Sequence, residues 1–240
     1  MKFKTLILLL LAITAATCVS AADNLTHYEL KFDEFHELKV VDGINVDYYC
    51  DSSKAGKVEF EAAPDVASAV MFEPSKGKLS IKLALRDGSY RNLPTIRVYS
   101  SYLTKVSNEG DSLVRVMSTA AGPKFYCRVM GNGRMSVRDI QVTNVEASIL
   151  SGHGTISIFG NAQNVRLKVT GAGQIQADEL QASDVDCTVT GTGIINCYAT
   201  ENLKYGGVGS GKVFYRGTPE IKKGLLTTVK VAPIENRSDK

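Results

Sequence analysis

The residues best suited to chemistry in this sequence are carboxylates in its second half, with one arginine near them. In a carbohydrate-active enzyme, two carboxylates flank the glycosidic bond and act as acid and as base or nucleophile. The candidates for such roles are Asp139, Asp178, Glu179, Asp184, Asp186 and Arg216. Their spacing does not force any two carboxylates together. The simpler interpretation is that they are outward-facing residues that keep the protein soluble.

Histidine, the residue most often recruited for acid-base catalysis and metal binding, is scarce. The chain has only His27, His36 and His153. His153 stands between two glycines, where a turn would expose it to solvent. No zinc-protease or serine-hydrolase motif is present. The sequence therefore predicts no catalytic residue, no metal site and no cofactor.

Paired glycines are the other motif that could bind a ligand. A Gly-x-Gly between a strand and a helix can hold phosphate on backbone amides, and calcium-binding repeats carry Asp shortly after the glycines. Here no helical pattern follows, and those carboxylates are missing. The five copies are Gly131/Gly133, Gly152/Gly154, Gly171/Gly173, Gly191/Gly193 and Gly209/Gly211. Their recurrence favours a structural role at corners of the backbone.

Successive Gly-x-Gly copies are 18 to 21 residues apart, and their flanks alternate between apolar and polar residues. Four residues after the first glycine stand Met135, Ile156, Ile175, Ile195 and Val213. A strand-turn-strand unit of this length cannot bury its own apolar face, but copies stacked about 4.8 Å apart can. The prediction is a single all-β domain, a β-solenoid of the right-handed parallel β-helix type. A β-sandwich or barrel of hairpins is the alternative.

The first half is less regular but still strand-like. Strands are expected at 37–41, 44–50, 57–62, 78–83 and 95–99, with a helical turn at 64–72 capped by Asp65. Asn108, Glu109 and Gly110 are interpreted as a degenerate corner in which Asn108 replaces the first glycine. Residues 24–45 and 221–234 are expected to cover the two open ends of the solenoid.

The first residues have the layout of a secretory signal: Lys2 and Lys4, an apolar stretch, then small residues. We predict a signal peptide at 1–22, cleaved after Ala21 or Ala22, a solenoid domain at 23–234 and a flexible tail at 235–240. Lipoprotein anchoring at Cys18 is an alternative. The mature chain is expected to contain no transmembrane segment and to be extracytoplasmic, in the periplasm or at the cell surface.

The mature chain would carry a net charge near +1, because the formal charge of +3 includes Lys2 and Lys4. This balance argues against a nucleic-acid partner. Cys50, Cys127, Cys187 and Cys197 could form disulfides, but the last three fall at inward positions of the repeat and are interpreted as core residues. Tyrosines that could stack on sugars or on a protein partner are Tyr48, Tyr49, Tyr90, Tyr99, Tyr102, Tyr126 and Tyr198.

The tripeptide Gly43, Ile44, Asn45, the serial Gly-x-Gly units and the closing stretch from Tyr215 to Pro219 together resemble the head GIN domain of the auto-transporter adhesin family of exported Bacteroidetes proteins. The resemblance covers about residues 30 to 224. It implies a β-helix-like fold, an extracytoplasmic location and no established catalytic activity. The chain departs from the family pattern in lacking an acidic residue after the second glycine. Any role of an acidic ladder at the corners is therefore in doubt.

The functional hypothesis is an exported, non-catalytic binding or structural module, with adhesion or interaction with the cell envelope as its role. Its partner would be a cell-surface glycan or an envelope protein, and no nucleic acid. The alternative is a carbohydrate-active β-helix enzyme, a polysaccharide lyase or hydrolase. An assembly subunit of the envelope is a third hypothesis.

Overall fold

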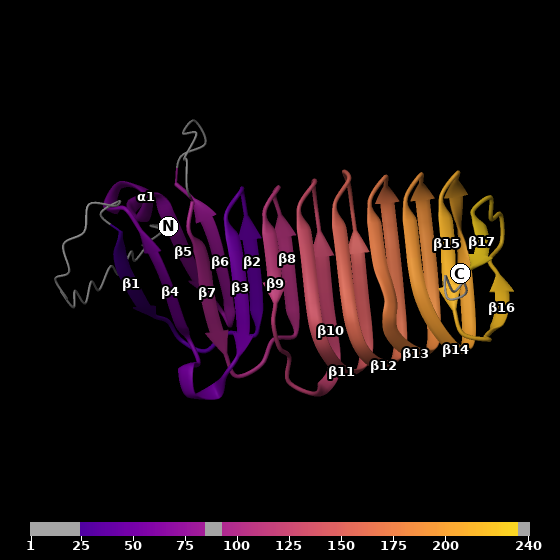
Figure 1. The fold of residues 1–240 in the computed structure, drawn as a ribbon, viewed down its shortest axis with the longest axis horizontal. Helices are drawn as coiled ribbons and strands as arrows, with labels where there is room; N and C mark the ends of the chain where they lie inside the picture. Colours follow the sequence, from indigo (N-terminus) through magenta and orange to yellow (C-terminus); the bar gives the residue numbers. More distant parts are fainter. Residues whose placement is uncertain (1–24, 85–92, 235–240) are drawn as a thin grey trace, which may run out of the picture.

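The computed structural model describes residues 25–84 and 93–234 as one elongated stack of strands (Figure 1). The predicted signal peptide, Cys18, Tyr90 and the predicted tail lie outside these residues. The first nine strands are β1 (Thr26–Lys31), β2 (Glu37–Val41), β3 (Asn45–Cys50), β4 (Lys57–Ala62), β5 (Val70–Ser75), β6 (Lys78–Leu83), β7 (Thr95–Ser100), β8 (Lys105–Glu109) and β9 (Leu113–Val116). A 3-10 turn, η1 (Ser52–Lys54), precedes β4.

The second half is a regular solenoid of parallel strands. Its strands are β10 (Gly122–Val129), β11 (Arg134–Ile149), β12 (Thr155–Gly171), β13 (Gln174–Gly191), β14 (Ile194–Gly209), β15 (Lys212–Arg216), β16 (Glu220–Lys223) and β17 (Lys230–Pro233). Each long strand pairs in parallel with the next, so residues one repeat apart lie side by side. The predicted β-solenoid is confirmed, and the five strands expected in the first half are present.

The coils of the first half are not stacked in sequence order. β2 lies between β6 and β8, and β3 lies between β7 and β9, all in parallel. Antiparallel β1, β4 and β5 cover this end instead. The expectation that residues 24–45 cover the end is therefore wrong beyond β1. Leu38 and Val40 of β2 are fully buried because coils flank them on both sides.

The expected helical turn is α1 (Pro64–Ala69), but Asp65 does not cap it. Pro64 occupies the first turn, so the N-cap is Ala63, which has no capping side chain. Within the described ranges, no helix has the length and apolar character needed to cross a bilayer.

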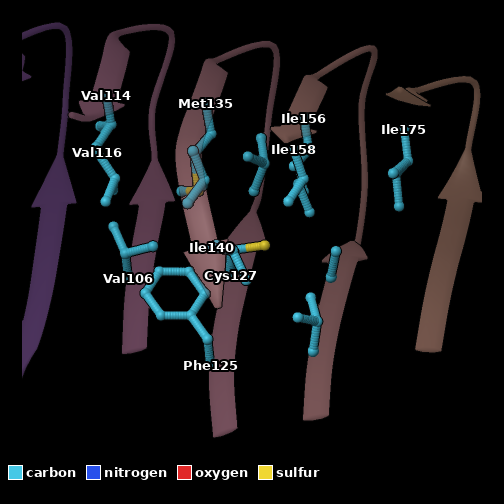
Figure 2. Close-up of a cluster of buried hydrophobic side chains, with 14 of the residues drawn as sticks. Val106, Val114, Val116, Phe125, Cys127, Met135, Ile140, Ile156, Ile158 and Ile175 are labelled. Carbon is cyan, nitrogen blue, oxygen red and sulfur yellow. The ribbon is translucent and has the colours of Figure 1, made fainter. Parts of the chain in front are cut away.

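The interior of the solenoid is filled by the apolar columns that the repeat predicts (Figure 2). Met135, Ile156 and Ile175 lie in one column with exposed fractions of 2% or less. Cys127, Cys187 and Cys197 are also buried, and all four described cysteines are free thiols. Burial raises the pKa of the Cys127 thiol, which disfavours the thiolate needed for reactivity.

The expected alignment of the degenerate corner is wrong by two residues. Asn108 pairs with Val129 and so lies in an inward column. Its buried amide donates to the carbonyl oxygens of Ser112 and Arg134 at 2.8 and 3.2 Å. These backbone acceptors allow a polar side chain to replace an apolar one there. Gly110 packs against Gly131 and takes the first-glycine position.

The two glycines of each corner meet different constraints. Gly171 has a φ of +107°, a region that residues with a Cβ rarely adopt. Gly173 lacks a positive φ, but a Cβ there would lie 2.8 Å from both the carbonyl oxygen of Gly154 and Cγ2 of Ile149. The same division holds for the other copies: φ is positive at Gly131, Gly152, Gly191 and Gly209, and a Cβ would collide with the preceding coil at Gly133, Gly154, Gly193 and Gly211.

Replacing either glycine by alanine should loosen the stack. We expect Gly171→Ala and Gly173→Ala each to lower the free energy of unfolding by about 1–3 kcal/mol, through backbone strain and overpacking respectively. Gly43→Ala is the matched control, because nothing lies within 4 Å of a Cβ at that glycine. Urea denaturation of the three variants measures the difference. Equal midpoints for all three would show that the corner glycines are dispensable.

Glu59 of β4 links the antiparallel strands at this end of the stack to β7. It accepts a hydrogen bond of 2.6 Å from the Tyr99 hydroxyl and lies 3.0 Å from Lys57 Nζ. Burial opposes the charged carboxylate, but these two partners outweigh it and lower the pKa of Glu59 below its ordinary 4.5. Burial and the same carboxylate raise the pKa of Tyr99 to about 12.

The lowered pKa of Glu59 predicts acid sensitivity of this end. A carboxyl group with a depressed folded-state pKa stabilises the fold above pH 4.5 and loses that contribution as pH falls through the folded value. Glu59→Gln should therefore be less stable than the wild type at pH 7 and lose less stability on acidification to about pH 3. Thermal unfolding at both values tests this. Glu61→Gln, an exposed change in the same strand, should follow the wild type.

Candidate functional site

A groove of about 700 Å³ runs along the outer face of β10 to β14 and β16. We call it the ladder groove. Two columns of outward side chains line it, one residue per coil. The first column is Lys124, Asn144, Asn164, Asp184 and Asn202; the second is Tyr126, Glu146, Arg166, Asp186, Lys204 and Lys222.

Amide groups dominate the first column of the ladder groove. Asn164 Nδ2 donates to Asn144 Oδ1 at 3.1 Å, and Asn202 Nδ2 donates to Asp184 Oδ1 at 2.7 Å. Each of these bonds joins two adjacent coils. Amides have further donors and acceptors beyond these bonds, so the column presents both kinds of group to a ligand.

The charges of the second column alternate from Glu146 to Lys204. Arg166 Nη1 lies 3.8 Å from Glu146, and Lys204 Nζ lies 3.6 Å from Asp186. Tyr126 stands at one end, partly exposed, with Lys124 Nζ 5.6 Å from the centre of its ring. Exposed ion pairs at these distances contribute little to stability. They leave a polar surface that is close to neutral in total charge.

The structure does not bring the candidate carboxylates together in one place. Asp184 and Asp186 lie in the ladder groove, two residues apart on β13. The other candidates are not among its lining residues. Asp139 is at a bulge of β11 with a φ of +55°, and Arg216 pairs with Asp178 at 3.9 Å, beside Glu179.

The three histidines are apart from the ladder groove. His27 lies 3.8 Å from Glu61, and His36 stacks on Tyr102 with ring centres 5.9 Å apart. His153 is exposed at its corner, as expected, and its backbone amide donates to Asn132 Oδ1 at 3.3 Å.

One group of potential metal ligands occurs among the described residues. His27, Glu29 and Glu59 place ligand atoms within 4.8 Å of one another. However, Lys57 Nζ lies 2.9 Å from Glu29 and 3.0 Å from Glu59. The ammonium group of Lys57 therefore already neutralises these carboxylates from within the fold.

Most of the candidate tyrosines serve the fold. Tyr48 is buried, and its hydroxyl lies 2.8 Å from Ser100 Oγ. Tyr49 stacks on Tyr99 with ring centres 5.3 Å apart. Of the described candidates, only Tyr126 lines the ladder groove.

The sequence reasoning missed most of the ladder groove. It identified Tyr126, Asp184 and Asp186 but not the residues stacked beside them. Asn144, Asn164, Asp184 and Asn202 recur with the spacing of the glycine corners, as do Glu146, Arg166, Asp186 and Lys204. Aligning outward columns in the same way as the inward ones would have found them.

Several solved structures share this architecture. A putative adhesin from Bacteroides fragilis superposes with a TM-score of 0.77 at 20% identity, over 90% of this chain and 97% of the other. A putative adhesin from Parabacteroides distasonis gives 0.72 at 24% identity, over 88% and 98%. A putative lipid binding protein from Parabacteroides distasonis gives 0.68 at 23% identity, over 87% and 97%. At these identities the likeness shows the fold.

No curated protein matches the sequence significantly. The family model described as putative auto-transporter adhesin, head GIN domain, matches residues 34–219. That match runs from just before β2 to the turn after β15 and includes the GIN tripeptide, every glycine corner and the whole of β10 to β14. The chain therefore belongs to the head GIN domain family of putative auto-transporter adhesins.

Proposed function

We propose that this protein is an extracytoplasmic, non-catalytic binding module whose ladder groove holds an extended glycan chain. The observation that carries the proposal is the pair of continuous polar columns along a groove of about 700 Å³. Side-chain amides and charged groups repeat at the spacing of the coils, and Tyr126 stands at one end. A linear polymer offers similar groups at regular intervals along its length, so it can bind along a surface whose side chains also repeat at regular intervals.

The chemistry of the lining suits hydroxyl-rich ligands. Asn144, Asn164 and Asn202 can donate to and accept from sugar hydroxyls, and Tyr126 offers a ring face at one end. The near balance of charges favours a neutral or zwitterionic polymer over a polyanion. The structures from Bacteroides fragilis and Parabacteroides distasonis that are named putative adhesins agree with a binding role outside the cytoplasm. The apolar start of the sequence supports export.

A carbohydrate-active enzyme is the second candidate, because Asp184 and Asp186 both lie in the ladder groove. Each already has a partner: Asp184 accepts from Asn202, and Asp186 lies near Lys204. These contacts tie both carboxylates to the neighbouring coil, so their place in the ladder groove is accounted for without catalysis.

Binding should depend on the columns of the groove. Purified bacterial and host glycans on an array, followed by calorimetry of the best ligand, would identify and quantify binding. Asn164→Ala combined with Asp184→Ala should weaken the affinity about tenfold or more, since hydrogen bonds worth roughly 1–3 kcal/mol are lost. The matched control is Asn161→Ala with Gln181→Ala, an exposed pair in the same two strands outside the groove, which should bind like the wild type.

The wild-type protein and the best glycan ligand from the array also test whether the protein only binds the glycan or cleaves it. The wild-type protein should leave the bound glycan at its original length after prolonged incubation, as judged by mass spectrometry. Shortening of the glycan that stops in Asp184→Asn or Asp186→Asn would establish the enzyme instead. If no glycan binds, or if both double variants bind equally well, the groove is not the glycan site.

A further inference from the structure

Exposed apolar side chains gather at the C-terminal end of the solenoid. The loop between β16 and β17 carries Leu225 and Leu226, which are 97% and 91% exposed. Val208 on the neighbouring corner and Ile221 in β16 are 60% and 41% exposed. This loop and the two strands form the last coil of the stack, at the right-hand end of Figure 1. Adjacent leucines without any cover are costly for a surface that meets only water.

The loop is firmly attached although its leucines are uncovered. Gly224 N donates to the carbonyl oxygen of Tyr205 at 2.8 Å, and Thr228 N donates to that of Gly207 at 3.1 Å. The Thr228 hydroxyl donates to the Gly209 carbonyl oxygen at 2.8 Å. Between these anchors Leu226 adopts a φ of +53°, which is unfavourable for leucine. The anchored base therefore presents both leucines to solvent in a defined conformation.

Lysines flank the two leucines in the sequence. Lys222 and Lys223 precede them and Lys230 follows. The register places Lys222 beside Lys204 and Lys230 beside Lys212, although like charges on adjacent strands repel. Among residues 25–84 and 93–234, no carboxylate lies within 4 Å of the ammonium groups of Lys212, Lys223 or Lys230. Lys222 lies 3.2 Å from Glu220 and Lys204 lies 3.6 Å from Asp186, so the described part of this end is only partly compensated and keeps an excess of positive charge.

An exposed apolar tip flanked by lysines matches the boundary of a lipid bilayer with anionic headgroups. A second copy of the chain fits less well, because two such ends would repel each other. Pro233 also removes a backbone donor from the edge of β17. We propose that the C-terminal coil docks on an anionic lipid surface, with Leu225 and Leu226 inserted below the headgroups and Lys222, Lys223 and Lys230 on the lipid phosphates. The proposal does not depend on which ligand the groove holds, although Lys222 also lines the last rung of the ladder groove.

Vesicle co-sedimentation of the mature chain tests the proposal. The protein should bind vesicles of equal parts phosphatidylglycerol and phosphatidylcholine at least about tenfold more tightly than vesicles of phosphatidylcholine alone. Raising the salt from about 50 to about 500 mM should weaken the binding, because the headgroup attraction is screened. Leu225→Ser with Leu226→Ser should reduce the affinity at least about tenfold. Both leucines are solvent-exposed, so thermal unfolding should be unchanged.

A charge-matched pair of variants completes the design. Lys222→Gln, Lys223→Gln and Lys230→Gln together should abolish the preference for anionic vesicles. Lys54→Gln, Lys76→Gln and Lys168→Gln, which remove the same charge from exposed sites elsewhere, should retain it. Equal binding by the leucine variant and the wild type, or no binding by the wild type, would overturn the proposal. So would sedimentation equilibrium showing a dimer that the leucine variant dissociates, since the apolar tip would then serve a second copy.

Discussion

The close approach of each corner to the one before it controls the rest of this structure. The amide of the residue after the second glycine donates to the carbonyl oxygen of the second glycine in the preceding coil. The N to O distances are 3.0, 3.0, 3.0 and 3.1 Å for Thr155, Gln174, Ile194 and Lys212. A side chain at the second glycine would part the two backbones. In the regular coils the close contact therefore depends on a glycine at that position, whereas Ser112 and Val229 occupy it in the flanking coils.

The surface chemistry follows from the same register. A single coil contributes one amide and one charged group, which is too little to recognise a polymer. When the coils are held in step, Asn144, Asn164 and Asn202 form a column, and so do the charges beside them. The same register also brings the like charges of Lys204 and Lys222 side by side at one end, which is unfavourable. The groove and the basic end are both properties of the stack and not of any one coil.

The sequence predicted the regular part of the fold well, because glycine spacing and inward columns report directly on stacking. It could not predict that β2 lies between β6 and β8. The alternation of Leu38 and Val40 is the same whether a strand is central or at an edge, so it carries no information on neighbours. Asn108 misled for a related reason: its partners, Ser112 and the Arg134 carbonyl, are supplied by the turn and by the adjacent coil. The groove was only partly predicted, since outward residues were not aligned by column.

The repeat allows the length of the outer face to change separately from its chemistry. Each coil makes the same backbone contacts to its neighbours and extends the stack by about 4.8 Å. Insertion or loss of one whole unit, such as residues 174–193, would keep the remaining corners in register. A change of only a few residues would instead break the columns on both faces. The length of the outer surface is thus set by the number of coils. Its selectivity is set by the side chains that each coil places on it.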